Sequence, residues 1–294
     1  MGTSSMRVAV VAPCSPFPRD DFDRGVAWLR ARAEVRDDAR WYGRKGFLSG
    51  DDGARLAMLI EALRDPEVRC VWAARGGYGA TRLLERAGSD LLEALLADPK
   101  PIVGYSDVTG LHALWSRANV RSVHGAMVAA LGRDDPHAEE TWAVANGEIP
   151  SPWNGLETMH DGRTVEGLAL GGNLALLAAL AGTPWQMDLR GAVLFLEDIG
   201  EAPYRVDRML TTLRSSGALR GVGAVVLGDF VNCGVGLDGI TVRDVCFERL
   251  GDLGAPVMWG APFGHGAHNR PWVSGARVVV NPSRGTLRHL ESVR

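Results

Sequence analysis

The chain has 294 residues, of which 46% are hydrophobic and 23% are charged, and its formal net charge is −3. This is the composition of an ordinary globular protein, which excludes a disordered or fibrous chain. Lysines and arginines form no run, so the sequence lacks the charge pattern of a nucleic-acid-binding protein and favours a small molecule or a peptide as partner.

The cysteines and the apolar stretches indicate the compartment. The four cysteines, at positions 14, 70, 233 and 246, form no CxxC motif or close cluster, so we expect buried thiols rather than disulfides or a zinc site. The apolar stretch at 8–13 is too short for a signal-peptide core or a membrane span. We therefore expect a cytoplasmic protein that does not associate with membranes.

The first half of the chain alternates between buried strands and amphipathic helices. Strands are predicted at 7–13, 68–74 and 101–104, and helices at 20–32, 53–64, 80–96 and 108–117. This alternation predicts a parallel α/β sheet, whose ligand site lies beyond the carboxyl ends of its strands. Two polar loops, Arg75–Gly79 and Tyr105–Asp107, follow such strand ends.

The second half predicts another domain. Polar, turn-rich sequence over 134–164 places the boundary near residue 150, which gives an N-terminal α/β domain at 1–150 and a C-terminal domain at 151–294. The elements expected beyond the boundary are a helix at 173–180 and strands at 192–196, 224–227 and 276–280. They predict an α/β or α+β domain.

Ser106 is the candidate nucleophile. It lies at a strand-to-helix junction, where a tight turn exposes a hydroxyl and the first helical amides face any anion formed beside it. The alternative is that Ser106 or Asp107 only caps the helix. The pattern G-x-S-x-G is also incomplete, because Val108 replaces its second glycine.

Three further segments carry residues suited to catalysis. The glycines of Arg75–Gly79 allow backbone N–H groups to approach an oxyanion, although a plain turn is the alternative. Glu197 follows a buried strand, where a carboxylate is costly unless it has a partner; a solvated turn capping the next helix accounts for Asp198 and Glu201. His265 lies between glycines, and a metal site with His268 would have only two ligands.

Ser106, Glu197 and His265 together supply a nucleophile, an orienting acid and a base in the chain order Ser, acid, His. This set predicts a serine hydrolase but indicates no substrate.

The chain resembles the LD-carboxypeptidases of peptidase family S66 in six ordered segments over nearly its whole length. They are Arg75–Gly79, Gly104–Asp107, Gly171–Asn173, Gly182–Trp185, Leu196–Asp198 and Gly264-His265.

The resemblance implies a role for each matched residue. Ser106 is expected to be the nucleophile, His265 the general base and Glu197 the carboxylate that holds the imidazole. The oxyanion hole would consist of the Asp107 N–H and the Gly76-Gly77 turn.

The resemblance also implies a Rossmann-like N-terminal domain, a smaller β-rich C-terminal domain, a homodimer and no metal or organic cofactor. The implied reaction removes the terminal D-Ala from murein tetrapeptide, at the bond to the L-centre of diaminopimelate, in cytoplasmic cell-wall recycling. Arg75 and Arg205 are candidates for binding the substrate carboxylate, and Tyr105 joins them as a candidate substrate-binding residue.

Two alternatives stay open. Relatives of the microcin-immunity type cleave the amide between an acidic aminoacyl group and a nucleotide analogue, but they are longer chains. A non-catalytic binding protein would keep the fold, yet all three candidate catalytic residues are present.

Overall fold

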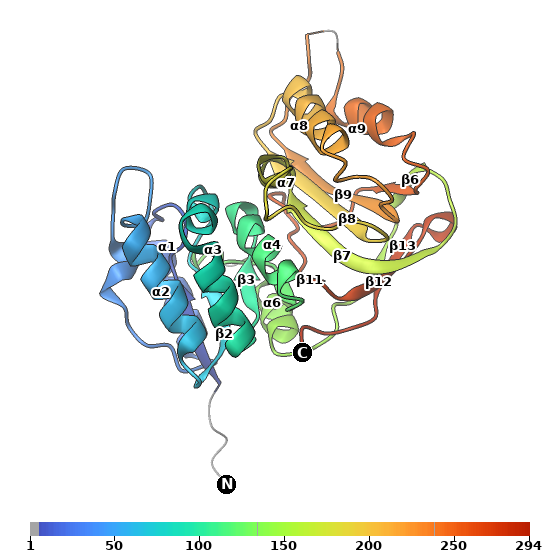
Figure 1. The fold of residues 1–294 in the computed structure, drawn as a ribbon. Coiled ribbons are helices and arrows are strands. Elements are labelled where there is room, and N and C mark those ends of the chain that lie inside the picture. Colours follow the sequence, from blue (N-terminus) through green and yellow to red (C-terminus); the bar gives the residue numbers. More distant parts are fainter. Residues whose placement is uncertain (1–5, 134, 238) are drawn as a thin grey trace.

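The computed structural model describes residues 6–133, 135–237 and 239–294, arranged as two α/β domains that lie side by side (Figure 1). The first five residues of the predicted N-terminal domain, together with 134 and 238, lie outside the described part.

The N-terminal domain is built on a five-stranded sheet in the order β1-β2-β3-β4-β11. Its strands are β1 (Arg7–Val11), β2 (Val68–Ala73), β3 (Ile102–Gly104), β4 (Ser122–His124) and β11 (Trp272–Ser274). The first four are parallel, whereas β11 runs antiparallel to β4. This edge strand comes from near the C-terminus, so the two halves of the chain share one sheet.

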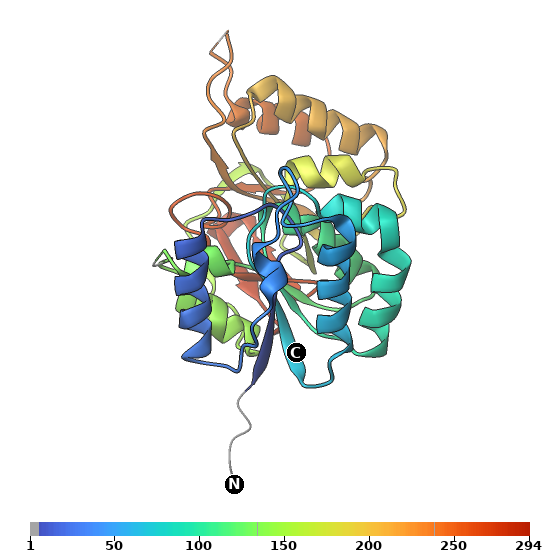
Figure 2. The ribbon, with the colours of Figure 1, turned by 90° about the vertical axis from the view of Figure 1, so that its left-hand side faces the viewer.

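Helices cover both faces of this sheet. They are α1 (Arg19–Arg30), α2 (Asp52–Arg64), α3 (Ala80–Ala97), α4 (Thr109–Arg117), α5 (Val128–Leu131) and α6 (Ala138–Ala145), with short 3-10 turns η1 (Ala39–Tyr42) and η2 (Ser106–Val108). Figure 2 shows α1, α5 and α6 on one face and α2, α3 and α4 on the other. The β-branched strands are therefore buried on both sides, as parallel strands require.

The C-terminal domain contains an eight-stranded mixed sheet in the order β5-β13-β12-β7-β8-β9-β10-β6. Its strands are β5 (Trp153–Asn154), β6 (Glu157–His160), β7 (Val165–Asn173), β8 (Val193–Ile199), β9 (Ala224–Val231), β10 (Val257–Trp259), β12 (Arg277–Asn281) and β13 (Thr286–His289). Its helices are α7 (Leu174–Leu180), α8 (Pro203–Ser215) and α9 (Val242–Leu250), with the 3-10 turn η3 (Pro282–Arg284). Strands β7 to β10 are parallel and the remaining pairs are antiparallel.

The structure confirms the predicted fold class, a parallel-sheet N-terminal domain beside a β-rich C-terminal domain. It also confirms that the four cysteines are buried free thiols. Of the helices that the structure describes, none is long and apolar enough to cross a membrane.

Candidate functional site

Ser106 lies two residues after the end of β3, beyond Tyr105, and begins η2 with a left-handed backbone conformation, φ 62°. A residue other than glycine adopts this conformation at a cost in strain, and such strain is common where a nucleophile is presented at a sharp turn. The strand end is fixed from behind by the fully buried His112, whose Nε2 donates to the Gly104 carbonyl oxygen at 2.9 Å. Ser106 therefore lies at the predicted strand-to-helix turn, where it is partly buried.

The Arg75–Gly79 turn packs directly against Ser106. A Cβ at Gly76 would lie 2.9 Å from the Ser106 Cβ and 3.3 Å from the Asp107 nitrogen, and a Cβ at Gly77 would lie 2.5 Å from the Ser15 side chain. Ser15 also bonds the turn at both ends, because its N–H donates to Gly76 O and its hydroxyl accepts from the Tyr78 N–H. Glycine is needed here for close backbone approach.

Asp107 caps a helix, but not the one that follows it. Its buried carboxylate accepts from the Ala80 N–H at 2.8 Å, at the start of α3, and it makes no cap on η2 or α4. Burial raises the pKa of this carboxyl, and the Ala80 hydrogen bond opposes the rise. The alternative that the Ser106 or Asp107 side chain caps the following helix is not what the structure shows, because the glycine turn brings the start of α3 next to Asp107.

Glu197 and His265 form a close pair. The His265 Nδ1 lies 2.6 Å from the Glu197 Oε2, and Glu197 is completely buried. Burial lowers the pKa of His265, but the hydrogen bond to Glu197 and its negative charge outweigh burial, so the pKa is raised. The imidazole is thereby oriented with Nε2 left for another partner.

Asn173 binds the carboxylates of both Glu197 and Asp198, a role that the sequence did not indicate. It lies opposite Glu197 in the β7–β8 register, and its Nδ2 donates to the Glu197 Oε1 at 3.4 Å and to the Asp198 Oδ1 at 3.0 Å. The motif Gly171–Asn173 was the only available signal. A Cβ at Gly172 would lie 2.5 Å from the Thr109 Oγ1, so the motif also lets β7 approach the start of α4.

Asp198 differs from the predicted solvated turn, whereas Glu201 lies partly exposed in the turn before α8. Asp198 is buried and its Oδ2 accepts from the Ala175 N–H at 2.9 Å, so it caps α7 instead of α8. Burial raises its pKa to about 6. Glu201 lies 3.6 Å from Arg205. The interpretation of Asp198 was therefore wrong, because β8 continues through it instead of ending before it.

The two halves of the site meet at Tyr105. Its ring centroid lies 5.0 Å from that of His265, and Ser106 is its next residue. Within the part of the chain that the structure describes, no hydrogen bond joins Ser106 to His265. Tyr105 thus brings the turn of Ser106 next to the ring of His265, an arrangement compatible with a Ser–His–Glu set.

The three candidate substrate-binding residues lie in different surroundings. Tyr105 contacts the His265 ring. Arg75 is exposed, donates to the Pro16 carbonyl oxygen at 2.6 Å and lines an open hollow beside the glycine turn. Arg205 is occupied by Glu201 and the Tyr204 hydroxyl. The geometry thus favours Arg75 over Arg205 as a group near the nucleophile.

His268, the other histidine of the loop, does not share a ligand position with His265. Its Nδ1 lies 3.2 Å from the His137 Nε2, whereas His265 contacts Glu197. Among the residues described, no group of three or more His, Cys, Asp or Glu side chains is arranged to hold a metal ion.

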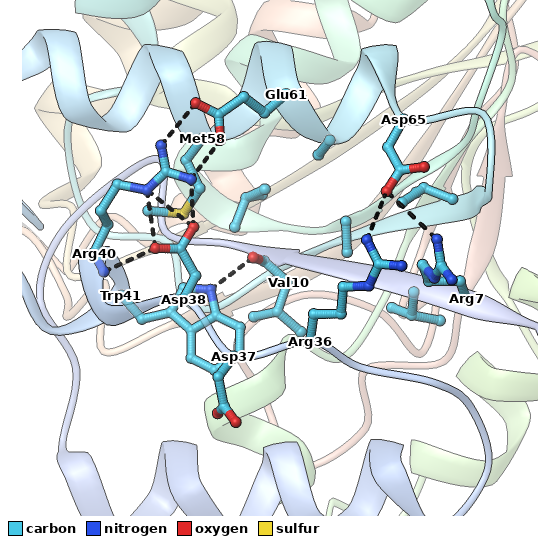
Figure 3. Close-up of a pocket in the computed structure, with 15 residues that line it drawn as sticks. Arg7, Val10, Arg36, Asp37, Asp38, Arg40, Trp41, Met58, Glu61 and Asp65 are labelled. Atoms are coloured by element: carbon cyan, nitrogen blue, oxygen red, sulfur yellow. Dashed lines mark hydrogen bonds and ion pairs between the residues drawn. The ribbon is translucent and has the colours of Figure 1, made fainter.

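A hollow beside β1 is separate from these residues (Figure 3). Its charged side chains pair with one another: Arg40 binds Asp38 and Glu61, and Arg7 and Arg36 both approach Asp65. The Trp41 Nε1 donates to Val10 O and closes part of the strand edge. Because these charged side chains pair with one another, we do not assign the hollow a role in binding the substrate.

Comparisons with known proteins agree with these observations. Family models of the LD-carboxypeptidase N-terminal and C-terminal domains match residues 8–125 and 166–280. A putative carboxypeptidase of Synechocystis sp. is 35% identical over 97% of this chain and 94% of its own. The murein tetrapeptide carboxypeptidase of Pseudomonas aeruginosa is 31% identical over 95% of this chain and 94% of its own.

Solved structures show the same architecture. The muramoyltetrapeptide carboxypeptidase from Oxalobacter formigenes has a TM-score of 0.83 and 31% identity, covering 98% of this chain and 99% of that chain. The microcin C7 self-immunity protein MccF, in complex with glutamyl sulfamoyl guanosine, has a TM-score of 0.85 but only 20% identity, covering 99% of this chain and 98% of its own. The second likeness is one of fold alone.

Proposed function

Because the chain belongs to the LD-carboxypeptidase family, peptidase S66, we propose that it is a serine carboxypeptidase that removes the C-terminal D-Ala from murein tetrapeptide. The scissile bond joins the L-centre of diaminopimelate to D-Ala. The name of the Pseudomonas aeruginosa relative supports this substrate class.

One observation carries the catalytic part of the proposal. The buried Glu197 holds the His265 imidazole at 2.6 Å, and Tyr105, which precedes the strained Ser106, lies against the same ring. A buried carboxylate, an oriented imidazole and a hydroxyl on a strained turn are the parts of a serine hydrolase.

In the proposed mechanism His265 takes the Ser106 proton through Nε2 as the hydroxyl attacks the scissile carbonyl. It then gives this proton to the departing D-Ala amine, and water cleaves the acyl-enzyme with the same base. Glu197 keeps Nδ1 protonated and stabilises the imidazolium.

The oxyanion would be bound by the Asp107 N–H and the Gly76-Gly77 turn. This assignment is supported by the contact between Gly76 and both Ser106 and the Asp107 nitrogen. The free substrate carboxylate requires a cation, for which Arg75 is the better-placed candidate because a guanidinium binds a carboxylate through two parallel hydrogen bonds.

The test is an incubation of the purified protein with murein tetrapeptide, followed by mass spectrometry for tripeptide and free D-Ala. We expect wild type to release D-Ala and Ser106→Ala to release none while keeping its unfolding temperature. A parallel incubation with an aspartyl-sulfamoyl-adenosine conjugate tests the amidase alternative. Release of free aspartate without D-Ala would overturn the proposed substrate, and normal turnover by Ser106→Ala would overturn the nucleophile.

A further inference from the structure

The segment 264–271 carries His265 among small residues, and its far end is held to the C-terminal domain where the Arg270 N–H donates to the Pro262 carbonyl oxygen at 2.8 Å. Gly264 has φ 121°, and Gly266 and Ala267 follow the histidine. Inside the C-terminal domain the segment is held by Glu197 and by the Asn269 Oδ1, which accepts from the Gly264 N–H at 3.1 Å. These contacts orient the imidazole within its own domain, whereas Ser106 belongs to the other domain.

Arg270 ties this segment to α6 of the N-terminal domain. Its Nη2 and Nε donate to the two oxygens of Glu140 at 2.6 and 3.1 Å, which is a bidentate ion pair. Both side chains are mostly buried, with 22% and 23% of their surfaces exposed. A bidentate, partly buried pair of this kind imposes a fixed geometry, unlike a single exposed ion pair.

Two histidines add a second connection across the same junction. The His137 Nε2 lies 3.2 Å from the His268 Nδ1, and the His137 Nδ1 lies 3.3 Å from the Glu140 Oε2. Glu140 therefore contacts Arg270 of the 264–271 segment and also His137, which in turn contacts His268 of that segment.

Helix α6 is itself attached to the sheet that presents Ser106. The Thr141 Oγ1 accepts from the Ala126 N–H at 3.4 Å, just beyond β4. A Cβ at Gly125 would lie 2.8 Å from the Thr141 side chain and 3.3 Å from Pro271. Glu140 is thus anchored near β4, which is paired with β3, the strand that leads to Ser106.

We infer that Glu140 and Arg270 are positioning residues for the proposed reaction: β11 continues the 264–271 segment into the N-terminal sheet, and the ion pair fixes the stretch before β11 against α6, which sets the distance between His265 and Ser106. The inference rests on the proposed function for its kinetic test. Without the pair the 264–271 segment moves more, so the His265–Glu197 hydrogen bond varies in geometry and the imidazole is less often placed for proton transfer; small displacements of reacting groups reduce rates strongly.

The kinetic test compares Glu140→Gln and Arg270→Gln with a matched control on the same helix. Glu139, the neighbouring residue, pairs with Arg32 inside the N-terminal domain and does not reach the 264–271 segment. We expect Glu140→Gln and Arg270→Gln to lower kcat about 10- to 100-fold with KM changed less than about threefold. Glu139→Gln should retain the wild-type kcat.

The double variant Glu140→Gln/Arg270→Gln separates positioning from folding. It leaves no unpaired charge, so its unfolding temperature should stay close to that of wild type, while its kcat should match that of the single variants because all three remove one interaction. A double variant with wild-type kcat, or with the product of the two single losses, would overturn the inference.

A second readout needs no substrate. The Nδ1–H of His265 should give a downfield proton NMR signal, identified by its loss in His265→Ala, and we expect Glu140→Gln to broaden it while Glu139→Gln leaves it sharp. An unchanged signal together with unchanged kcat in Glu140→Gln would refute the positioning role. If wild type fails to release D-Ala, the proposed substrate fails, and the NMR comparison alone decides the role of Glu140.

Discussion

At the scale of single residues, the pair of Glu197 and His265 predicts how activity depends on pH. His265 must be neutral to accept the Ser106 proton, so kcat/KM should fall as the pH drops through the His265 pKa. Burial lowers this pKa, but the hydrogen bond and charge of Glu197 raise it above its usual value near 6.5. Glu197→Gln should therefore move the acid limb of the kcat/KM profile to lower pH.

The same substitution should reduce kcat by up to about 10⁴-fold, because the orienting carboxylate is lost but the nucleophile and base remain. The measurement is kcat/KM between pH 5 and pH 9. Glu201→Gln is the matched control, since Glu201 contacts Arg205 and not the imidazole. An acid limb that stays in place in Glu197→Gln would show that Glu197 does not set the His265 pKa.

The sequence identified the residue types of this site but not their partners. Capping of the next helix in the chain was the alternative considered for Asp107 and for Asp198, which lies within β8. Asp107 caps α3 and Asp198 caps α7, helices that tertiary packing brings alongside. A capping residue can be predicted locally only when its helix follows it in the chain.

At the scale of elements, the glycine turn after β2 predicts a substitution that acts on the nucleophile. Gly76 does not have the positive φ of Gly77 and Gly79, so alanine fits its backbone, but the new Cβ would lie 2.9 Å from the Ser106 Cβ. Gly76→Ala should displace Ser106 or close the space for the oxyanion. We expect kcat to fall about 100-fold or more, the loss found when one oxyanion donor is removed.

The control for this substitution is Gly53→Ala in α2. A Cβ there would lie 3.2 Å from the Asp51 Oδ1, which caps α2, and would meet no residue of the candidate site. Gly53→Ala should therefore keep the wild-type kcat. The role of Gly76 would have to be withdrawn if its alanine variant retained wild-type kcat.

The helices of the first half were predictable because their apolar spacing is regular, whereas β7 (Val165–Asn173), α9 (Val242–Leu250) and several short strands were not predicted. Strands β4, β10 and β11 have three residues each, and three residues cannot show an alternating pattern. Strand β11 pairs with β4 only because the chain returns from the C-terminal domain to the N-terminal sheet. The local sequence around β11 does not predict this long-range pairing.

At the scale of the whole molecule, one of the matched motifs has no catalytic residue but packs one domain against the other. Trp185, from the segment Gly182–Trp185, packs so closely on α3 that a Cβ at Gly88 would lie 2.1 Å from its ring. The segment was recognisable only by its resemblance to the family, because a single tryptophan after a proline does not predict which element it packs against. The boundary near residue 150 stays a prediction, as does the homodimer.

The C-terminal core also predicts how stability depends on pH. His289 is buried in β13 with its ring 5.3 Å from that of Trp153, and neither ring nitrogen has a hydrogen-bond partner among the described residues. Burial, assisted by the charge of Arg270, lowers the pKa of His289 to about 3. The unfolded chain therefore binds this proton near pH 6.5 and the folded chain does not, so stability is lost as the pH falls from about 6.5 towards 3.

His289→Phe should remove this loss. At pH 5 the penalty amounts to about 2 kcal/mol for one histidine, so the variant should lose about 2 kcal/mol less than wild type between pH 7.5 and pH 5. His265 and Asp198 have raised pKa values and act in the opposite direction, but they are common to both proteins and cancel in the comparison. Urea unfolding at the two pH values measures the difference, and equal losses in variant and wild type would mean that His289 binds its proton as readily in the folded protein as in the unfolded chain.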